Sequence, residues 1–276
     1  MRRNLIYGLI WASLVIGGSI FLGNAFNPLQ MSAYSRQALP PDEDTLKLLN
    51  KLYHTSFILE KTPSGNIVNY LPRFGMFDEE QAASIAELWG AETEYYESEY
   101  QYFFTDSDGI LAVDKFGDRI EFIGESPPVR KDPPEIFDNV AAEYADIFMR
   151  NRLDFFEYEE TVTSFDNGVF QVTFIERLGN LKNYAFPAVV RVDGKGNIYS
   201  AEYYFLSYDK LDSFPIKSEA EAYYDLPLDI DSPVDLKKST LVYCYRNSIL
   251  QPCYLFEGEY ADGRNFQTFV EATLYY

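Results

Sequence analysis

Residues 78–104 read DEEQAASIAELWGAETEYYESEYQYFF, a helix start followed by an alternating strand. The Asp78 side chain can accept from free backbone N–H groups of the helix, and Gln81 can reach back to this cap. In residues 96–104, one face holds Tyr96, Tyr100, Tyr102 and Phe104, and the other holds Glu97, Glu99 and Gln101. Such alternation is typical of a strand with one face in water. The stretch therefore predicts a helix packed on an antiparallel sheet.

The same pattern recurs along the chain. Asp132 precedes Pro133-Pro134-Glu135, and Ser218 precedes Glu219-Ala220-Glu221, so both predict capped helices; a further helix is expected at about 44–53. Turn signals containing Gly separate the strand-like runs at 107–109, 116–118, 166–168, 193–197 and 261–263. Asp-Gly and Asn-Gly pairs favour tight hairpins, so neighbouring strands should be antiparallel. The sequence thus predicts an α+β fold with helices packed on antiparallel sheets.

A boundary between two subdomains is predicted at residues 124–132, GESPPVRKD, where prolines and mixed charges interrupt the pattern. The first α+β subdomain would span 44–130 and the second 131–276. A Pro-rich stretch before a helix is equally compatible with a loop inside one domain.

The N-terminal segment predicts a membrane anchor. Arg2 and Arg3 precede an apolar run at residues 5–23, LIYGLIWASLVIGGSIFLG. About 20 apolar residues span the hydrocarbon core, and positive charge before them keeps the N-terminus in the cytoplasm. We therefore expect a transmembrane helix at 1–23, a tether at 24–43 and an extracytoplasmic C-terminal body. The alternative is a secretory signal cleaved after Ala25, and both alternatives export the chain.

The charge of the body excludes one class of partner. Without Arg2 and Arg3, the 23 basic residues of the chain become 21, against 43 acidic residues. An excess of this size repels phosphate backbones, so no nucleic-acid partner is expected. The 23 Tyr and 22 Phe residues provide ample apolar surface for a folded core.

Catalytic motifs are missing from the sequence. His54 is the single histidine, and no nucleophile elbow, zinc-protease motif, phosphate-binding loop or dinucleotide fingerprint occurs. We therefore expect no enzyme activity, no cofactor and no metal. Acidic residues at 106–108 and 225–235 are interpreted as solvated turns, with calcium binding left open.

Cys244 and Cys253 are the only cysteines. In an exported chain, two cysteines that flank an expected hairpin predict a disulfide. Two buried free thiols are the alternative, because cross-strand geometry does not always permit a bridge.

Several C-terminal stretches resemble the extracytoplasmic domain of YycI/YycH-type regulatory proteins. The resemblance rests on residues 186–193 (FPAVVRVD), 196–198 (GNI), 214–222 (FPIKSEAEA) and 250–258 (LQPCYLFEG). It implies a single-span membrane protein whose outer domain modulates a sensor histidine kinase. PepSY-like domains, which regulate or inhibit proteases, are the second resemblance. The cysteine pair and the high acid content depart from both families.

The leading hypothesis is therefore a membrane-tethered extracytoplasmic regulator that binds a membrane or envelope protein. In the Tyr-rich strand expected at 199–208, Tyr204 falls on the face with Ser200 and Glu202, opposite the face expected to cover the core. Tyr204 is thus a candidate anchor for the partner. The alternative hypothesis is a glycan-binding or structural protein of the cell envelope, which would use the many tyrosine rings.

Overall fold

The computed structural model describes residues 41–63, 65–125 and 128–274. The predicted anchor at 1–23, and the tether up to residue 40, lie outside these residues. Within the described ranges, no helix combines the length and the apolar character needed to cross a membrane.

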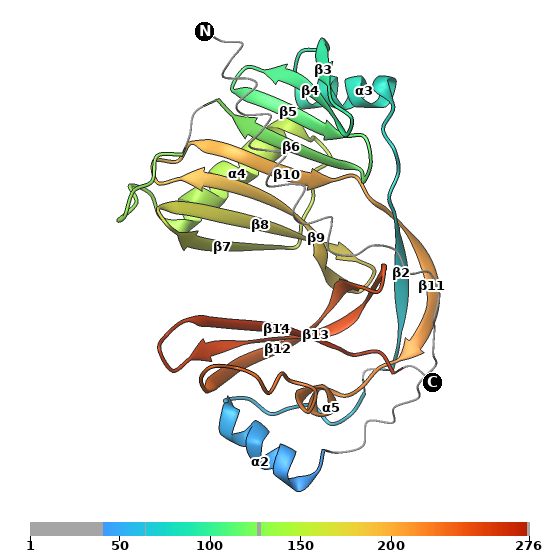
Figure 1. The fold of residues 1–276 in the computed structure, drawn as a ribbon, viewed down its shortest axis with the longest axis vertical. Coiled ribbons are helices and arrows are strands. Elements are labelled where there is room, and N and C mark those ends of the chain that lie inside the picture. The colour runs from blue at the N-terminus through green and yellow to red at the C-terminus, as the bar shows by residue number, and fades with distance from the viewer. Residues whose placement is uncertain (1–40, 64, 126–127, 275–276) are drawn as a thin grey trace. The chain divides into compact units, whose positions relative to one another are not determined.

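Two similar units follow one another along the chain (Figure 1). The first repeat, residues 79–124, consists of helix α3 (Glu79–Trp89) and strands β3 (Tyr95–Glu97), β4 (Gln101–Asp106), β5 (Gly109–Asp114) and β6 (Arg119–Gly124). The second repeat, residues 138–204, consists of α4 (Asp138–Arg152), β7 (Glu160–Asp166), β8 (Val169–Leu178), β9 (Leu181–Asp193) and β10 (Ile198–Tyr204). Each repeat is one helix followed by a four-stranded antiparallel meander.

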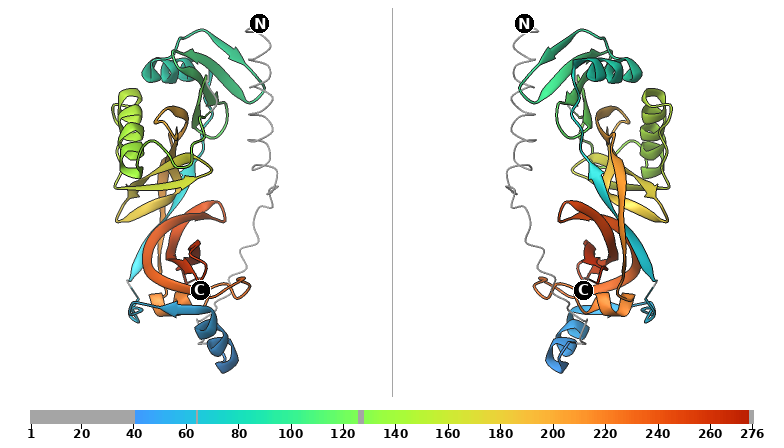
Figure 2. Two further views of the ribbon diagram at one scale, coloured as in Figure 1. Left: turned by 90° about the vertical axis from the view of Figure 1, so that its left-hand side faces the viewer. Right: turned by 90° about the vertical axis from the view of Figure 1, so that its right-hand side faces the viewer.

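The last strands of the two repeats, β6 and β10, pair antiparallel with each other. This pairing joins the two meanders into one eight-stranded sheet in the order β3-β4-β5-β6-β10-β9-β8-β7. Figure 2 shows α3 and α4 on the same face of this sheet. The opposite face carries neither helix.

One hydrophobic core lies between the two helices and the sheet. The helices face it with small residues and one large side chain each, namely Ala82, Ala86 and Trp89 of α3 and Ala141, Ala145 and Met149 of α4. Because alanine is small, the helix backbones can approach the aromatic sheet residues closely. Phe104, Phe122, Phe170 and Phe174 are among the buried sheet side chains.

An ion pair inside this core connects the two repeats. Arg152, at the end of α4, pairs with Asp106 at the β4–β5 hairpin; the Asp106 side chain is fully buried, and that of Arg152 is 14% exposed. A guanidinium nitrogen also donates to the Trp89 carbonyl at 3.0 Å. The Arg152 side chain therefore ties the end of α4 to α3 and to the first meander.

A second sheet is formed mainly by the C-terminal part of the chain. Its strands follow the order β11-β2-β13-β12, with β14 added on β13 and β1 on β12. The strands are β1 (Tyr53–Thr55), β2 (Asn66–Arg73), β11 (Ser207–Pro215), β12 (Val234–Arg246), β13 (Ile249–Tyr260) and β14 (Asn265–Glu271). Helices α2 (Glu43–Leu52) and α5 (Glu219–Tyr223) contribute Leu49, Ala222 and Tyr223 to its separate core.

The two sheets are continuous, as parts of one 14-stranded sheet, where β12 pairs with β9 through Tyr243 and Asn183. Asn183 is fully buried, and its amide donates to Glu176 at 2.8 Å and to the Tyr208 hydroxyl at 3.0 Å. Tyr208 in turn donates to Glu176 at 3.0 Å. This network satisfies the polar groups that the junction buries.

A disulfide joins Cys244 of β12 to Cys253 of β13, with the two Cα atoms 6.0 Å apart. Both cysteines are buried, at 6% and 0% exposure. The bridge lies inside the second sheet, across the hairpin that the sequence indicated.

The α+β class is confirmed, and so are two of the predicted helix starts. Asp78 and Ser218 both form capping boxes, with Gln81 and Glu221 as their partners. Helix α2 begins close to the expected position and is capped by Asp42.

The helix start predicted at Asp132 is wrong. Helix α4 begins five residues later than predicted, at Asp138, and its N-cap Phe137 makes no side-chain cap bond. The Glu135 N–H donates instead to the Gly194 carbonyl, and the Val129 N–H donates to Asp193. Contacts with the β9–β10 turn therefore hold this segment outside the helix.

The single strands predicted at 96–104 and 199–208 are each two strands. Ser98 Oγ accepts from the Gln101 N–H at 3.0 Å, which makes a turn between β3 and β4. As a result Tyr96 is exposed, while Tyr102 and Phe104 are buried. In the second case the Phe205 N–H donates to the Asp118 carbonyl, and the chain then continues as β11 in the other sheet.

The division into subdomains 44–130 and 131–276 stays a prediction. Strands from the two sides of residue 130 pair directly, since β6 pairs with β10, and β2 pairs with β11 and β13.

We predict that Arg152→Ala lowers the free energy of unfolding by about 3–5 kcal/mol, because it leaves the buried Asp106 carboxylate without its partner. Arg177→Ala is the control, since Arg177 pairs with Glu159 but is 58% exposed. It should cost about 1 kcal/mol or less. Denaturant unfolding measures both values, and equal losses in the two variants would contradict a special role for the buried pair.

Candidate functional site

Four aromatic rings from distant parts of the chain meet where the two sheets join. We call them the ring cluster: Phe74 after β2, Phe186 on β9, Tyr204 on β10 and Tyr245 on β12. The Phe186 ring is central, with its centroid 5.1 Å from that of Tyr245, 5.5 Å from Tyr204 and 5.6 Å from Phe74. The rings of Phe74 and Tyr245 are 6.2 Å apart.

Strand pairing brings these rings together. The bridge between Tyr243 and Asn183 sets β12 beside β9, which brings Tyr245 to Phe186. Strand β10 pairs with another part of β9 and supplies Tyr204. Phe74 arrives from the other sheet, where the chain leaves β2.

The ring cluster is partly open to solvent. Phe74 is 43% exposed and Tyr245 is 40% exposed, while Phe186 and Tyr204 are half-buried. Exposed apolar side chains that occur singly are normal on a protein surface, but a contiguous group is typical of interaction sites. Aromatic side chains are also enriched among the residues that dominate binding energy at protein interfaces.

A charged cluster adjoins Tyr204 on the sheet. The Tyr204 hydroxyl donates to Glu202 at 2.7 Å, and Arg119 Nε lies 3.1 Å from the same carboxylate. Arg119 also pairs with Glu121 at 3.1 Å and with Asp114 at 3.5 Å. All four charged side chains are only 19–26% exposed. One guanidinium thus holds three carboxylates.

The carboxylates of this cluster differ in acidity. Glu202 and Glu121 lie directly opposite each other in the β6–β10 pair. Burial raises the pKa of Glu121 and of Asp114, and the attraction of Arg119 offsets this only in part. Burial also acts on Glu202, but Arg119 and the Tyr204 hydroxyl outweigh it and lower the pKa of Glu202. Burial and the Glu202 carboxylate raise the pKa of Tyr204, so its hydroxyl remains a donor.

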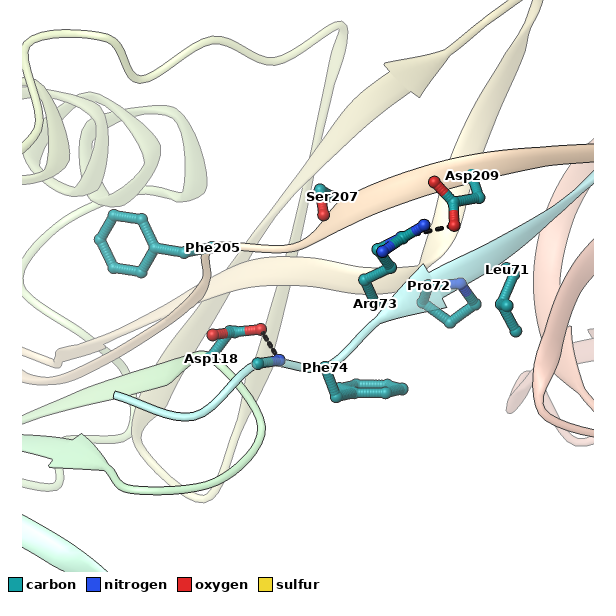
Figure 3. Close-up of a pocket in the computed structure, with 9 residues that line it drawn as sticks. Leu71, Pro72, Arg73, Phe74, Asp118, Phe205, Ser207 and Asp209 are labelled. Carbon is teal, nitrogen blue, oxygen red and sulfur yellow. Dashed lines mark hydrogen bonds and ion pairs between the residues drawn. The ribbon is translucent and has the colours of Figure 1, made fainter. Parts of the chain in front are cut away.

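A shallow pocket of about 660 Å³ borders the ring cluster at Phe74. Figure 3 shows Arg73 pointing to Asp209, with which it forms an ion pair, while the Phe74 ring points the other way. Asp118 accepts from the Gly75 N–H and so fixes the chain where it leaves β2. Both carboxylates of the pocket therefore already have partners.

Neither the pocket nor the acidic turns form a metal site in the described part of the chain. No group of three or more His, Cys, Asp and Glu side chains there could hold a metal ion. Asp106 is buried and pairs with Arg152, so its interpretation as part of a solvated turn is wrong. His54 is exposed on β1. The expectations of no enzyme activity and no cofactor stay predictions.

Of the residues singled out in the sequence, Tyr204 lies in the ring cluster, and its role as a partner anchor stays a prediction. Ala201 and Tyr203 face the core as expected, and Glu202 and Tyr204 face the other way. Sequence reasoning missed Phe74, Phe186 and Tyr245. Only the strand pairing brings these three rings together, and nothing in their local sequence distinguishes them from other aromatic residues.

The chain shows little similarity to known proteins. No protein-family model matches the chain, and no curated protein matches it. Among solved structures, the chain is similar to the Bacillus megaterium YpeB C-terminal domain, with 14% sequence identity and a TM-score of 0.47. The match covers 72% of this chain and 94% of that domain. The YycI/YycH-type and PepSY-like resemblances therefore stay predictions.

The two opposed glutamates should respond to pH with opposite signs. The lowered pKa of Glu202 means that its charge stabilises the fold above its ordinary pKa of 4.5, and this contribution is lost as the pH falls through the folded-state value. We predict that Glu202→Gln lowers the free energy of unfolding at pH 7, because it removes a charge that Arg119 and the Tyr204 hydroxyl stabilise.

Glu121→Gln, the matched variant, should instead raise the free energy of unfolding at pH 7, because burial destabilises the charged form of Glu121. Both differences should shrink toward zero in acid, where the folded protein carries both groups protonated. Denaturant unfolding between pH 3 and pH 7 measures them. Differences of equal sign, or differences independent of pH, would contradict the assignment.

Proposed function

We propose that the chain is a protein-binding module whose partner docks on the ring cluster. The single observation that carries the proposal is the meeting of four rings from four separate segments of the chain, two of them about 40% exposed, at the junction of the sheets. A partner side chain inserted among such rings loses water on all sides, which is the situation in which interface contacts contribute most.

The ring geometry favours a protein over a glycan. Within the cluster, ring planes are inclined by 57° for Phe186 with Tyr245 and by 77° for Phe74 with Phe186. Sugar rings stack on flat aromatic faces, whereas inclined rings form an irregular surface that suits a side chain. The glycan-binding alternative is favoured by a different observation, the exposure of Tyr96 at 70% and Tyr100 at 53%.

The proposal includes a place in the cell. The apolar run at 5–23 after two arginines, together with the acidic body, supports a chain tethered to the cell membrane with its C-terminal part outside the cytoplasm. The partner would then be a membrane or envelope protein, such as a sensor kinase or a protease. In this role the chain acts by binding alone and needs neither a cofactor nor catalysis.

Site-specific crosslinking tests the docking site. A photoreactive residue at position 245 of the full chain, in its native membrane, should capture one discrete protein. The matched control is position 96, which is more exposed but lies outside the ring cluster. Phe74→Ala should reduce capture from position 245 at least 5-fold, because truncating an aromatic side chain that anchors a partner costs more than about 1 kcal/mol.

Two further variants separate the ring of Tyr204 from its hydroxyl. Tyr204→Phe keeps the ring and should retain most of the capture, whereas Tyr204→Ala should reduce it. The proposal fails if positions 245 and 96 capture the same proteins equally. It also fails if purified chain binds envelope glycans and Tyr96→Ala, rather than Phe74→Ala, removes that binding.

A further inference from the structure

Strand β7 forms one margin of the eight-stranded sheet (Figure 1). In the described part of the chain it pairs with β8 alone. The hairpin between them turns at Asn167 and Gly168, both with positive φ, and Asp166 pairs with Val169. In a two-residue hairpin this closing pair exchanges both backbone hydrogen bonds, and the bonding then alternates along the strand.

That alternation decides which backbone groups of β7 point outward. Val162 and Ser164 direct their N–H and C=O groups to β8, as Asp166 does. Thr161, Thr163 and Phe165 direct theirs away from the sheet. The outward N–H and C=O groups of these three residues can therefore pair with another strand.

Other margins of the sheets are protected in the ways that proteins use against strand addition. Strand β3 has only three residues. Strand β11 has an irregular register after Lys210 and ends at Pro215. Near the end of β14, the Phe269 carbonyl accepts from Arg246 at 3.4 Å, and the Tyr184 ring lies 6.0 Å from the Phe269 ring.

Strand β7 carries none of these protections. Its sequence, ETVTSFD, has no proline, glycine or lysine, and it is rich in residues that favour strands. On the face without the helices, Val162 is 38% exposed and Ser164 is also exposed. A strand added here could pack apolar side chains on Val162 and on the half-buried Thr163.

The charge around β7 indicates which side chains an added strand should have. Residues 154–166 contain five acidic side chains and no basic one. Glu159 and Glu160 pair with Arg177 and Lys182. In the described part of the chain, Asp154, Glu157 and Asp166 are exposed and form no ion pair. In the described part of the chain, acidic side chains without an ion pair therefore lie at the end of β7, at Asp166, and in the segment before its start, at Asp154 and Glu157.

We propose that β7 binds an extended segment of a partner protein that has basic side chains at both ends and β-branched residues between them, by strand addition. A second copy of this chain fits less well. Antiparallel self-pairing centred on Thr163 would place Glu160 opposite Asp166, between molecules that each carry a net charge of −20. This surface is separate from the ring cluster, so the proposal does not depend on the docking site above.

Hydrogen exchange with a synthetic peptide tests the proposal on the full chain. The probe is KTVTVTK, and the control is ETVTVTE, in which glutamate replaces both lysines. Binding of the probe should slow exchange of the outward amides of Thr161, Thr163 and Phe165 at least 10-fold. The amides of Val162 and Ser164, already bonded to β8, should change little. The glutamate peptide should have no effect at the same concentration.

Two variants at one position provide the matched comparison. Thr163→Pro removes an outward N–H without removing a bond to β8, a substitution that edge strands tolerate. It should weaken binding of the probe at least 10-fold, whereas Thr163→Val, which keeps the N–H, should bind as well as the original chain. The exchange experiment on the unchanged chain gives an answer even if Thr163→Pro does not fold.

Four outcomes would overturn the proposal. They are unchanged exchange on β7 at saturating probe, protection of β14 amides instead of β7 amides, equal binding of the lysine and glutamate peptides, and self-association of the chain through β7. The last outcome would identify β7 as a contact between two copies of this chain.

Discussion

The antiparallel pairing of β6 with β10 is the interaction on which the rest of the structure depends. It runs from Ser200 opposite Ile123 to Tyr204 opposite Arg119. Without it, each repeat would be a helix on a short meander with an open edge and half a core. With it, both helices cover one continuous sheet, and Phe122 and Ala201 become fully buried members of one shared core.

The same pairing also determines the chemistry of the other face. Because side chains alternate along a strand, the register that buries Phe122 and Ala201 brings Glu121 and Glu202 together on the opposite side. Two like charges at that distance repel, and Arg119 reduces the repulsion by pairing with both. Tyr204 lies on the same face and donates to Glu202, so the contribution of Tyr204 to the ring cluster follows from this pairing.

The sequence predicted the local parts of this structure well. Asp78 and Ser218 cap helices because a cap involves only residues within one turn. The Gly-containing turns at 107–109 and 166–168 lie between paired strands for the same reason. The disulfide could be predicted too, since Cys244 and Cys253 flank a hairpin.

Features that depend on distant contacts could not be predicted from one sequence. The segment after Asp132 has the composition of a helix start, but its backbone bonds to the β9–β10 turn some 60 residues away. Phe74 and Tyr245 are separated by more than 150 residues and meet only because both sheets meet. The ring cluster therefore had no local signal, although Tyr204 was identified from the alternation of its strand.

The measurement that tests this account most directly is native-state hydrogen exchange in the full chain carrying Ile120→Ala. Ile120 lies on β6, is 1% exposed and belongs to the shared core. If the β6–β10 pairing makes one cooperative unit of the two repeats, protection should fall by the same free energy in β4 and β5 of the first repeat and in β8 and β9 of the second. Loss of protection confined to β4 and β5 would contradict the account, because the two repeats would then be independent units that only touch.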